Sequence, residues 1–168
     1  KKRIDNVILE ASSHGLDQGR LNGINFKAGI FTNLSQDHLD YHKSMQNYFK
    51  AKMILFSKIL KKDAFVITDS KLKEFPKIKK IVKNKNTILD INQKKIRKLG
   101  FKDKFQLPGD FQFKNFLMAA LASKLCGGKI SSISKNLKKI KPVNGRLELI
   151  RTLPNEAKIF IDYAHTPD

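Results

Sequence analysis

The chain has 168 residues and a mass of 19.2 kDa, and its 40% of hydrophobic residues suffice for a folded core and exceed what a disordered tail contains. Its one cysteine, Cys126, excludes an intramolecular disulfide framework and a cysteine-based zinc site. No apolar run approaches the roughly 20 residues needed to cross a bilayer. We therefore expect a soluble domain, or part of a larger protein, that does not enter a membrane.

Apolar runs that predict strands alternate along the chain with stretches of helical periodicity. The predicted strands are residues 7–9, 28–34, 64–68, 87–91, 147–150 and 158–163. The predicted helices are residues 44–60, 111–126 and 130–140, with a weaker amphipathic segment at 72–82 that Pro76 interrupts and an unpatterned basic stretch at 94–104. This alternation is typical of an α/β domain with a mostly parallel sheet flanked by helices.

The net charge of +19 invites a nucleic-acid-binding function, but the kind of basic residue argues against it. Lysine accounts for 29 of the 34 basic residues, and the arginines are only Arg3, Arg20, Arg97, Arg146 and Arg151. Sites that read bases or hold phosphates are richer in arginine, because its guanidinium group forms paired hydrogen bonds. We therefore expect a lysine-rich solvated surface and no nucleic-acid partner, with a basic nucleic-acid-binding module as the alternative.

Histidines and carboxylates gather in polar loops that follow predicted strands. Glu10 and His14 follow the first strand, residues 37–42 follow the second, and Asp162 and His165 follow the last. Ligands of open α/β sheets bind at the carboxyl ends of the strands. The loops therefore predict one convergent polar site.

Three kinds of chemistry compete for this site. Carboxylates beside His38 suit Mg²⁺, which prefers oxygen ligands. His38 and His42 form only a weak zinc pattern, because no helix obviously places both on one face. Ser12, His14 and Asp37 could assemble a hydrolase triad, but the sequence has no G-x-S-x-G nucleophile elbow. The composition of the loops thus favours magnesium.

Lys52 is the most specific physical clue, because it falls in the middle of the apolar stripe of the helix predicted at 44–60. The stripe consists of Met45, Tyr48, Phe49, Leu55, Phe56, Ile59 and Leu60. A buried unpaired ammonium group is costly, so Lys52 must pair, extend to solvent or be chemically altered. Periodicity alone favours a lysine that extends to solvent, and a carboxylated lysine that binds metal is the alternative.

Seven strings in a fixed order resemble the central domain of the Mur ligases. They are EASSHGL at 10–16, QGR at 18–20, FTNLSQDHLDYH at 31–42, YFKAK at 48–52, LPGDFQFKN at 107–115, PVNGR at 142–146 and IDYAHTPD at 161–168. The first two strings, which together read E-x-S-S-H-x-L-x-Q-x-R, and the DHLDYH part of the third are most similar to the member that adds the third amino acid to UDP-N-acetylmuramoyl-L-alanyl-D-glutamate in peptidoglycan synthesis. The resemblance implies a cytoplasmic, monomeric enzyme that uses ATP and Mg²⁺ and adds diaminopimelate or lysine through an acyl-phosphate intermediate.

The resemblance also implies roles for individual residues. Those that match magnesium-binding and catalytic residues are Glu10, His38 and Lys52, the last as a carbamylated lysine. Those that match residues holding the UDP-muramoyl dipeptide are Ser12, Gln18 and Arg20. Those that match ATP-binding residues are Asn115, near the adenine, and Arg146 and Asp162, near a phosphate or the ribose. Residues of the same motifs that receive no role are His14, Asp37, Asp40, His42 and His165.

The sequence also departs from the family pattern. The phosphate loop G-x-x-x-x-G-K-[ST] is missing, Gln112 stands where several members have Asn, and the stretch 92–106 is shorter and more basic than usual. We expect residues 1–160 to be part of the central domain, with the phosphate loop upstream, and residues 161–168 to join it to a C-terminal domain. Without that loop, residues 1–168 alone should be inactive. The alternative functions are those of a folylpolyglutamate-type or cyanophycin-type ligase, or of a binding protein that has lost activity.

Overall fold

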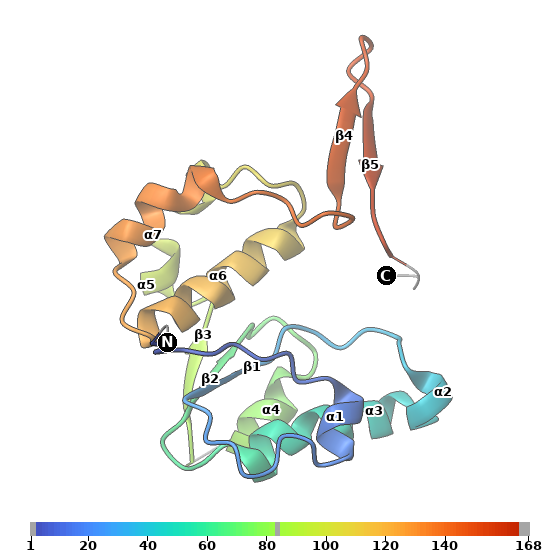
Figure 1. Cartoon of the computed structure of the whole chain (residues 1–168), viewed down its shortest axis with the longest axis vertical. Helices are drawn as coiled ribbons and strands as arrows, with labels where there is room; N and C mark the ends of the chain where they lie inside the picture. Colours follow the sequence, from blue (N-terminus) through green and yellow to red (C-terminus); the bar gives the residue numbers. More distant parts are fainter. Residues whose placement is uncertain (1–2, 83–84, 165–168) are drawn as a thin grey trace.

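Three short parallel strands form the centre of the computed structural model, which describes residues 3–82 and 85–164 (Figure 1). They are β1 (Ala28–Ile30), β2 (Phe65–Thr68) and β3 (Thr87–Asp90), hydrogen-bonded in the order β1-β2-β3. The middle strand β2 pairs in parallel with both neighbours. Each strand lies within a predicted strand segment, so the prediction of a parallel α/β sheet is confirmed.

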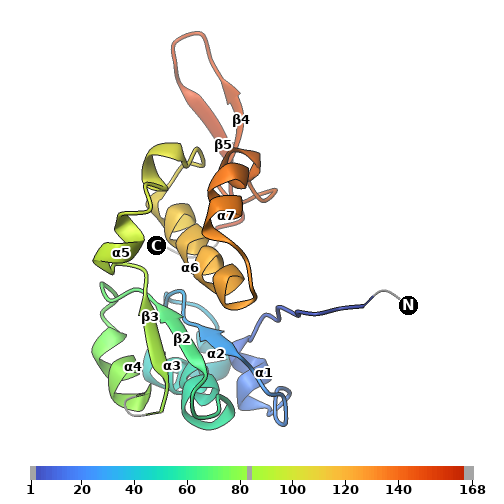
Figure 2. The same cartoon turned by 90° about the vertical axis from the view of Figure 1, so that its left-hand side faces the viewer.

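Helices cover both faces of this sheet (Figures 1 and 2). One face is covered by α1 (Ser13–Asp17), α3 (Met45–Ile54), which α2 (Leu39–His42) precedes, and α4 (Phe75–Val82). The other is covered by α5 (Lys94–Arg97) and α6 (Asp110–Leu125), with α7 (Ile130–Asn136) packed on α6. Successive residues of β2 face the two layers: Val66 joins the core with α3 and α4, and Ile67 packs with α6.

The helix predicted at 44–60 forms, but its last turn is wider than an α-helix. The Ser44 hydroxyl caps its start by accepting a hydrogen bond from the Asn47 N–H at 3.2 Å. From Leu55 to Ile59 the helix is π-helical. This turn lies directly on β1, where a Cβ at Gly29 would come within 3.1 Å of the Phe56 ring. A glycine in the strand therefore permits the close contact between helix and sheet.

Three predicted strands do not join the parallel sheet. Residues 7–9 form no strand, and Val7 and Ile8 are 71% and 89% exposed. A strand needs a partner for its backbone groups, and no described strand pairs with this segment. β4 (Glu148–Thr152) and β5 (Lys158–Ile161) do form, but as a separate antiparallel hairpin that projects from the body (Figure 1). They do not extend the parallel sheet.

The remaining segments differ in detail from what the sequence predicts. Pro76 does not interrupt α4, because it lies in the first turn, where its missing N–H leaves no hydrogen bond unmade. The basic stretch 94–104 contains α5 and a 3₁₀ turn at Lys102–Lys104. A second 3₁₀ turn, Leu137–Lys139, follows α7. No helix in the described ranges is long and apolar enough to span a membrane.

Candidate functional site

The loop after residues 7–9 folds into the short helix α1. The Ser12 hydroxyl caps it by accepting a hydrogen bond from the Gly15 N–H at 3.1 Å. The next residue, Ser13, is buried, and its Oγ lies 2.9 Å from Nε2 of His42. His14 is inside α1 and His42 ends α2, so the expectation that each histidine lies in a loop is wrong for these two. Helices rather than loops fix their positions.

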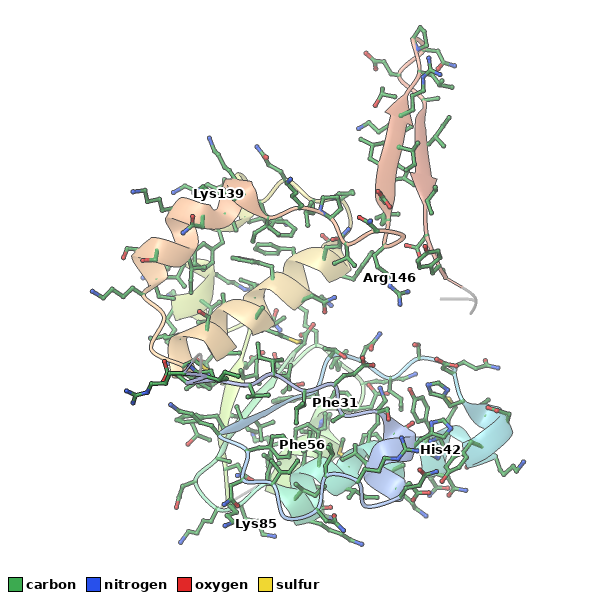
Figure 3. The ribbon with its side chains drawn as sticks, in the orientation of Figure 1. Phe31, His42, Phe56, Lys85, Lys139 and Arg146 are labelled. Atoms are coloured by element: carbon green, nitrogen blue, oxygen red, sulfur yellow. The ribbon has the colours of Figure 1, made fainter. Side chains whose placement is uncertain are left out.

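Three imidazole and two phenol rings pack together where α1, α2 and α3 meet (Figure 3). The His14 ring centroid lies 4.2 Å from that of Tyr41, 4.9 Å from that of His38 and 5.4 Å from that of His42. His42 also stacks on Tyr48 at 5.2 Å. Burial, reinforced by the neighbouring His14, lowers the pKa of His42. The histidines of the first two polar loops thus converge, as predicted, and His165 lies outside the described residues.

His38 has a strained backbone that Asp37 supports. Its φ angle of 54° places it in the left-handed region, which few residues other than glycine adopt. Its N–H donates a hydrogen bond to Asp37 Oδ1 at 2.7 Å, and its Nε2 lies 3.4 Å from Asp37 Oδ2. Strain that neighbouring groups maintain is common at functional sites, which supports the selection of His38.

Lys52 projects from α3 into the same aromatic cluster. Its Nζ lies 5.0 Å from the ring centroid of Tyr48 and 5.9 Å from that of Phe31, and it donates a hydrogen bond to the Asn33 carbonyl at 3.2 Å. No carboxylate lies within ion-pair distance of it in the described part of the chain. The half-buried side chain therefore neither forms an ion pair nor extends freely to solvent.

Burial is the main influence on the ionisation of Lys52. It lowers the pKa of the ammonium group, and the charge of Asp37 opposes this only in part. Tyr48, between Lys52 and the histidines, has its pKa raised by burial and by Asp37. The site thus increases the neutral amine fraction of Lys52, which is the nucleophilic form.

The third candidate metal ligand, Glu10, is exposed in the extended segment before α1. No hydrogen bond or ion pair joins it to His38 or Lys52 in the part of the chain that the structure describes. Nor does that part contain a group of three or more His, Cys, Asp or Glu side chains arranged to hold a metal. In the described residues, His38 and Lys52 therefore both lie against the Tyr48 ring, whereas Glu10 lies apart from them.

Two other sets of predicted residues each gather locally. Gln18 and Arg20 are exposed at the end of α1, and the Arg20 guanidinium donates a hydrogen bond to the Gln18 side-chain oxygen. Ser12 caps the other end of the same helix, so the three residues flank α1. These three residues are the candidates for holding the muramoyl dipeptide.

The candidate ATP-binding residues lie on α6 and at the base of the hairpin. Asn115 is exposed on α6, and Arg146 is exposed at the hairpin base and points toward the body (Figure 3). Gln112 joins the two elements by donating a hydrogen bond to the Arg146 carbonyl at 3.4 Å. The carboxylate of Asp162 accepts hydrogen bonds from the backbone N–H groups of Leu147 and Ala164, both at 2.7 Å. Asp162 is thus held by backbone groups beside Arg146.

Sequence reasoning missed a second polar cluster, at the ends of β2 and β3. Asp69, directly after β2, is 0% exposed, and its Oδ2 lies 2.8 Å from Nζ of Lys114 on α6. Asp90, the last residue of β3, accepts hydrogen bonds from the Ser70 and Asn92 N–H groups. The signal that could have found this cluster is the one used for Glu10, a carboxylate directly after an apolar strand.

Comparisons with known proteins agree with this architecture. The Mur ligase middle domain family matches residues 1–123. Enzymes named UDP-N-acetylmuramoyl-L-alanyl-D-glutamate–2,6-diaminopimelate ligase are similar: that of Rickettsia bellii is 39% identical over 100% of this chain and 39% of its own length, and that of Zymomonas mobilis is 37% identical over 98% and 38%. The chain therefore spans less than two fifths of these relatives.

A solved structure shows the same fold. The crystal structure of MurF from Acinetobacter baumannii superimposes with a TM-score of 0.58 at 14% identity, covering 76% of this chain and 32% of that one. The match to the middle-domain family covers well over half of the chain and includes β1 to β3 and the cluster around Lys52. This chain belongs to the Mur ligase middle domain family.

Proposed function

We propose that the protein is an ATP-dependent ligase that adds diaminopimelate to UDP-N-acetylmuramoyl-L-alanyl-D-glutamate. The observation that carries the proposal is the environment of Lys52, a half-buried amine between two aromatic rings with a lowered pKa. The amino acid is inferred from the names of the relatives that match nearly the whole chain. We place the enzyme in the cytoplasm as a monomer, with residues 1–160 in its central domain.

The proposed reaction transfers phosphate and then forms an amide. A carboxylate oxygen of the D-glutamyl residue attacks the γ-phosphorus of ATP, and the bond from that phosphorus to the bridging oxygen breaks, which releases ADP. The amine of diaminopimelate then attacks the acyl carbon and releases phosphate and a proton. The physical difficulty is that one anion approaches another, so the site must supply positive charge and exclude water.

We propose that Lys52 is carbamylated. Its neutral Nζ adds to the carbon of carbon dioxide and loses a proton, which leaves a carbamate anion on the nitrogen. The lowered pKa of Lys52 favours this step because only the unprotonated amine has a free electron pair. The charge changes from +1 to −1 at this position, so the formal net charge of +19 becomes about +17.

The donor chemistry of His38 and Lys52 fits magnesium once this carbamate is present. The His38 imidazole and the Lys52 carbamate would hold Mg²⁺, which would neutralise phosphate charge when bound, with Glu10, which the structure leaves apart from them, as the third proposed ligand. Without the carbamate the described residues offer no such group. The side chains around it have other tasks: Asp37 orients His38, and the Tyr48 and Phe31 rings exclude water from Lys52.

The remaining candidates bind the two anionic substrates in this proposal. Ser12, Gln18 and Arg20 hold the muramoyl dipeptide on the surface of α1. Asn115 lies at the adenine, while Arg146 and Asp162 lie at the phosphate or ribose. What supports these roles is their grouping: Ser12, Gln18 and Arg20 flank one short helix, and Asp162 accepts a hydrogen bond from the N–H of Leu147, the residue after Arg146.

The experiment that tests the function is Lys52→Ala in the full-length protein. We expect turnover to fall at least about 100-fold, because a charge-stabilising group of the site is lost. Added formate or acetate should restore part of the activity by supplying the missing carboxylate. Lys50→Ala is the matched control, because Lys50 is exposed on the same helix. Full activity of Lys52→Ala, or a loss in the Lys50 control of equal size, would contradict the proposal.

A further inference from the structure

The buried carboxylate of Asp69 connects three separate parts of the chain. Its Oδ1 accepts a hydrogen bond from the Lys71 N–H at 2.8 Å and another from the side-chain amide of Asn92. Its Oδ2 forms an ion pair with Lys114 Nζ at 2.8 Å and accepts no hydrogen bond from the described residues. Burial opposes the ionisation of Asp69, yet these partners keep the pKa of the carboxyl below its usual range. Asp69 is therefore a fixed anion inside the protein.

The sheet side of this cluster is rigid. Asp90 Oδ1 accepts hydrogen bonds from the Ser70 N–H and the Asn92 N–H, both at 3.0 Å. The Asn92 side chain bridges Asp69 and Asp90, so the carboxyl ends of β2 and β3 are joined by side chains as well as by the strand ladder. Asp69 is thus anchored to the sheet independently of α6.

Lys114 is the ionic link from this anchor to α6. The other contacts between α6 and the sheet layer are apolar, formed by Met118 and Leu121 with Ile67, at least one helical turn further along. Apolar packing has no preferred direction and resists a small shift along the helix axis weakly. A short ion pair with a fully buried carboxylate opposes any separation of its two charges, because little water is present to screen or replace them. Among the described residues, the contact between Lys114 and Asp69 is the only ion pair of α6.

Lys114 directly precedes Asn115, which the proposed function places at the adenine. We propose that Asp69 is a positioning residue for ATP: through Lys114 it fixes the first turns of α6, and with them Asn115, relative to the carboxyl edge of the sheet. This inference rests on the proposed function. Asp69 touches no substrate in this assignment and acts only through the ion pair.

The test uses the full-length protein and compares Lys114→Met with Lys124→Met. Both remove one positive charge from α6, but Lys124 is exposed in the last turn and far from Asp69 along the helix. We expect Lys114→Met to raise the KM for ATP about tenfold while kcat changes less than about twofold, since positioning of a bound nucleotide is weakened and the reacting groups are intact. The KM for the muramoyl dipeptide and all constants of Lys124→Met should stay unchanged.

A double-mutant cycle separates positioning from general loss of stability. Asn115→Ala should raise the KM for ATP, and Lys114→Met should add little to it if Lys114 acts through Asn115, whereas independent effects would multiply. Because Lys114→Met leaves the buried Asp69 unpaired, the variant Asp69→Asn combined with Lys114→Met serves as a second probe. This double variant should have a melting temperature closer to that of the wild type than Lys114→Met alone has, and it should keep the raised KM for ATP.

The outcomes distinguish two failures. If the wild type shows no ATP binding, the proposed function is wrong and the assignment of Asp69 falls with it. If the wild type binds ATP and Lys114→Met has an unchanged KM, or its effect multiplies with that of Asn115→Ala, only the positioning role of Asp69 is overturned. A raised KM that is not additive with Asn115→Ala supports it.

Discussion

The body of the molecule and the β4–β5 hairpin hold their candidate residues in different ways. In the body, Phe56 is 2% exposed and Ile67 is 0% exposed, whereas in the hairpin Phe160 is 37% and Ile161 is 46% exposed. His42 in the body is fixed by buried side chains, while Asp162 at the hairpin base is fixed by two backbone N–H groups. The body therefore holds its candidate residues through a packed core, and the hairpin holds its candidate residues through a few hydrogen bonds.

The difference suggests a division of tasks within the proposed reaction. A group that must act on a reacting atom benefits from fixed neighbours, and Lys52 has them in Tyr48, Phe31 and Asn33. A group that must admit and release a nucleotide benefits from local freedom, and Arg146 is exposed at the hairpin base. We expect perturbations of the body to act globally and those of the hairpin to act locally.

The largest expected effect is that of Phe56→Ala. This ring lies in the body core, 6.1 Å from the Phe31 ring, and packs over Gly29. Its removal should lower the free energy of unfolding by about 3–5 kcal/mol, because it leaves a cavity that the sheet cannot close. The measurement is denaturant unfolding.

Phe160→Ala is the matched change in the hairpin. This change should lower the free energy of unfolding by less than about 1 kcal/mol, because the ring is partly exposed and its truncation opens no enclosed cavity. Equal losses of unfolding free energy for Phe56→Ala and Phe160→Ala would contradict this difference, because they would show that the hairpin unfolds in the same cooperative unit as the body.

Asp162→Asn should have a smaller effect, confined to the hairpin base. Each carboxylate oxygen accepts one backbone N–H, from Leu147 or Ala164, and the amide of asparagine would direct its NH₂ group at one of these donors. Losing one charge-assisted hydrogen bond of about 1.4 kcal/mol should speed hydrogen exchange of the affected amide about tenfold.

The same variant should leave the thermal unfolding of the body unchanged. Glu156→Gln, at the exposed tip of the hairpin, removes the same charge without touching the base and serves as the control. A drop in the global melting temperature with Asp162→Asn would show that the hairpin base supports the body.

The sequence predicted local structure well where the signal was local. The periodicity of residues 44–60 predicted the α3 helix and the position of Lys52 on its apolar side, and Ser44 as its cap is confirmed. The alternation of strands and helices predicted the parallel sheet, because each βαβ step is coded within a few tens of residues. The grouping of His14, His38 and His42 was predicted from the rule that the carboxyl ends of parallel strands meet, but residues 7–9 form no strand, and the packing of α1 and α2 with α3 brings the histidines together.

Contacts between segments far apart in the sequence could not be predicted from the sequence. Residues 7–9 have the composition of a buried strand, but a strand also requires a partner, and periodicity does not show one. Asp69 and Lys114 are 45 positions apart, so their ion pair depends on how α6 lies across β2. The hairpin strands were predicted individually, whereas their antiparallel pairing apart from the sheet was not. Tyr48 was predicted on the same face of the helix as Lys52, whereas the contact of Lys52 with Phe31, which follows β1, was not.

The smallest expected effect concerns pH and again contrasts the body with the hairpin. The pKa of His42 is lowered from 6.5 by burial, so in the window below 6.5 the unfolded chain binds more protons at this position than the folded one. Stability of the body should therefore rise with pH up to about 6.5 and fall as the pH drops below it. His42→Gln should remove this part of the slope in thermal unfolding.

Hydrogen exchange can follow the two regions in one experiment. After correction for intrinsic rates, the protection of body amides should follow the His42-dependent slope, while that of the Leu147 amide at the hairpin base should not, because Asp162 rather than a histidine holds it. An unchanged slope in His42→Gln would assign the pH dependence to other groups. A parallel slope at Leu147 would mean that the hairpin base opens only when the whole body unfolds, and the division between a packed and a locally held half of the site would then be lost.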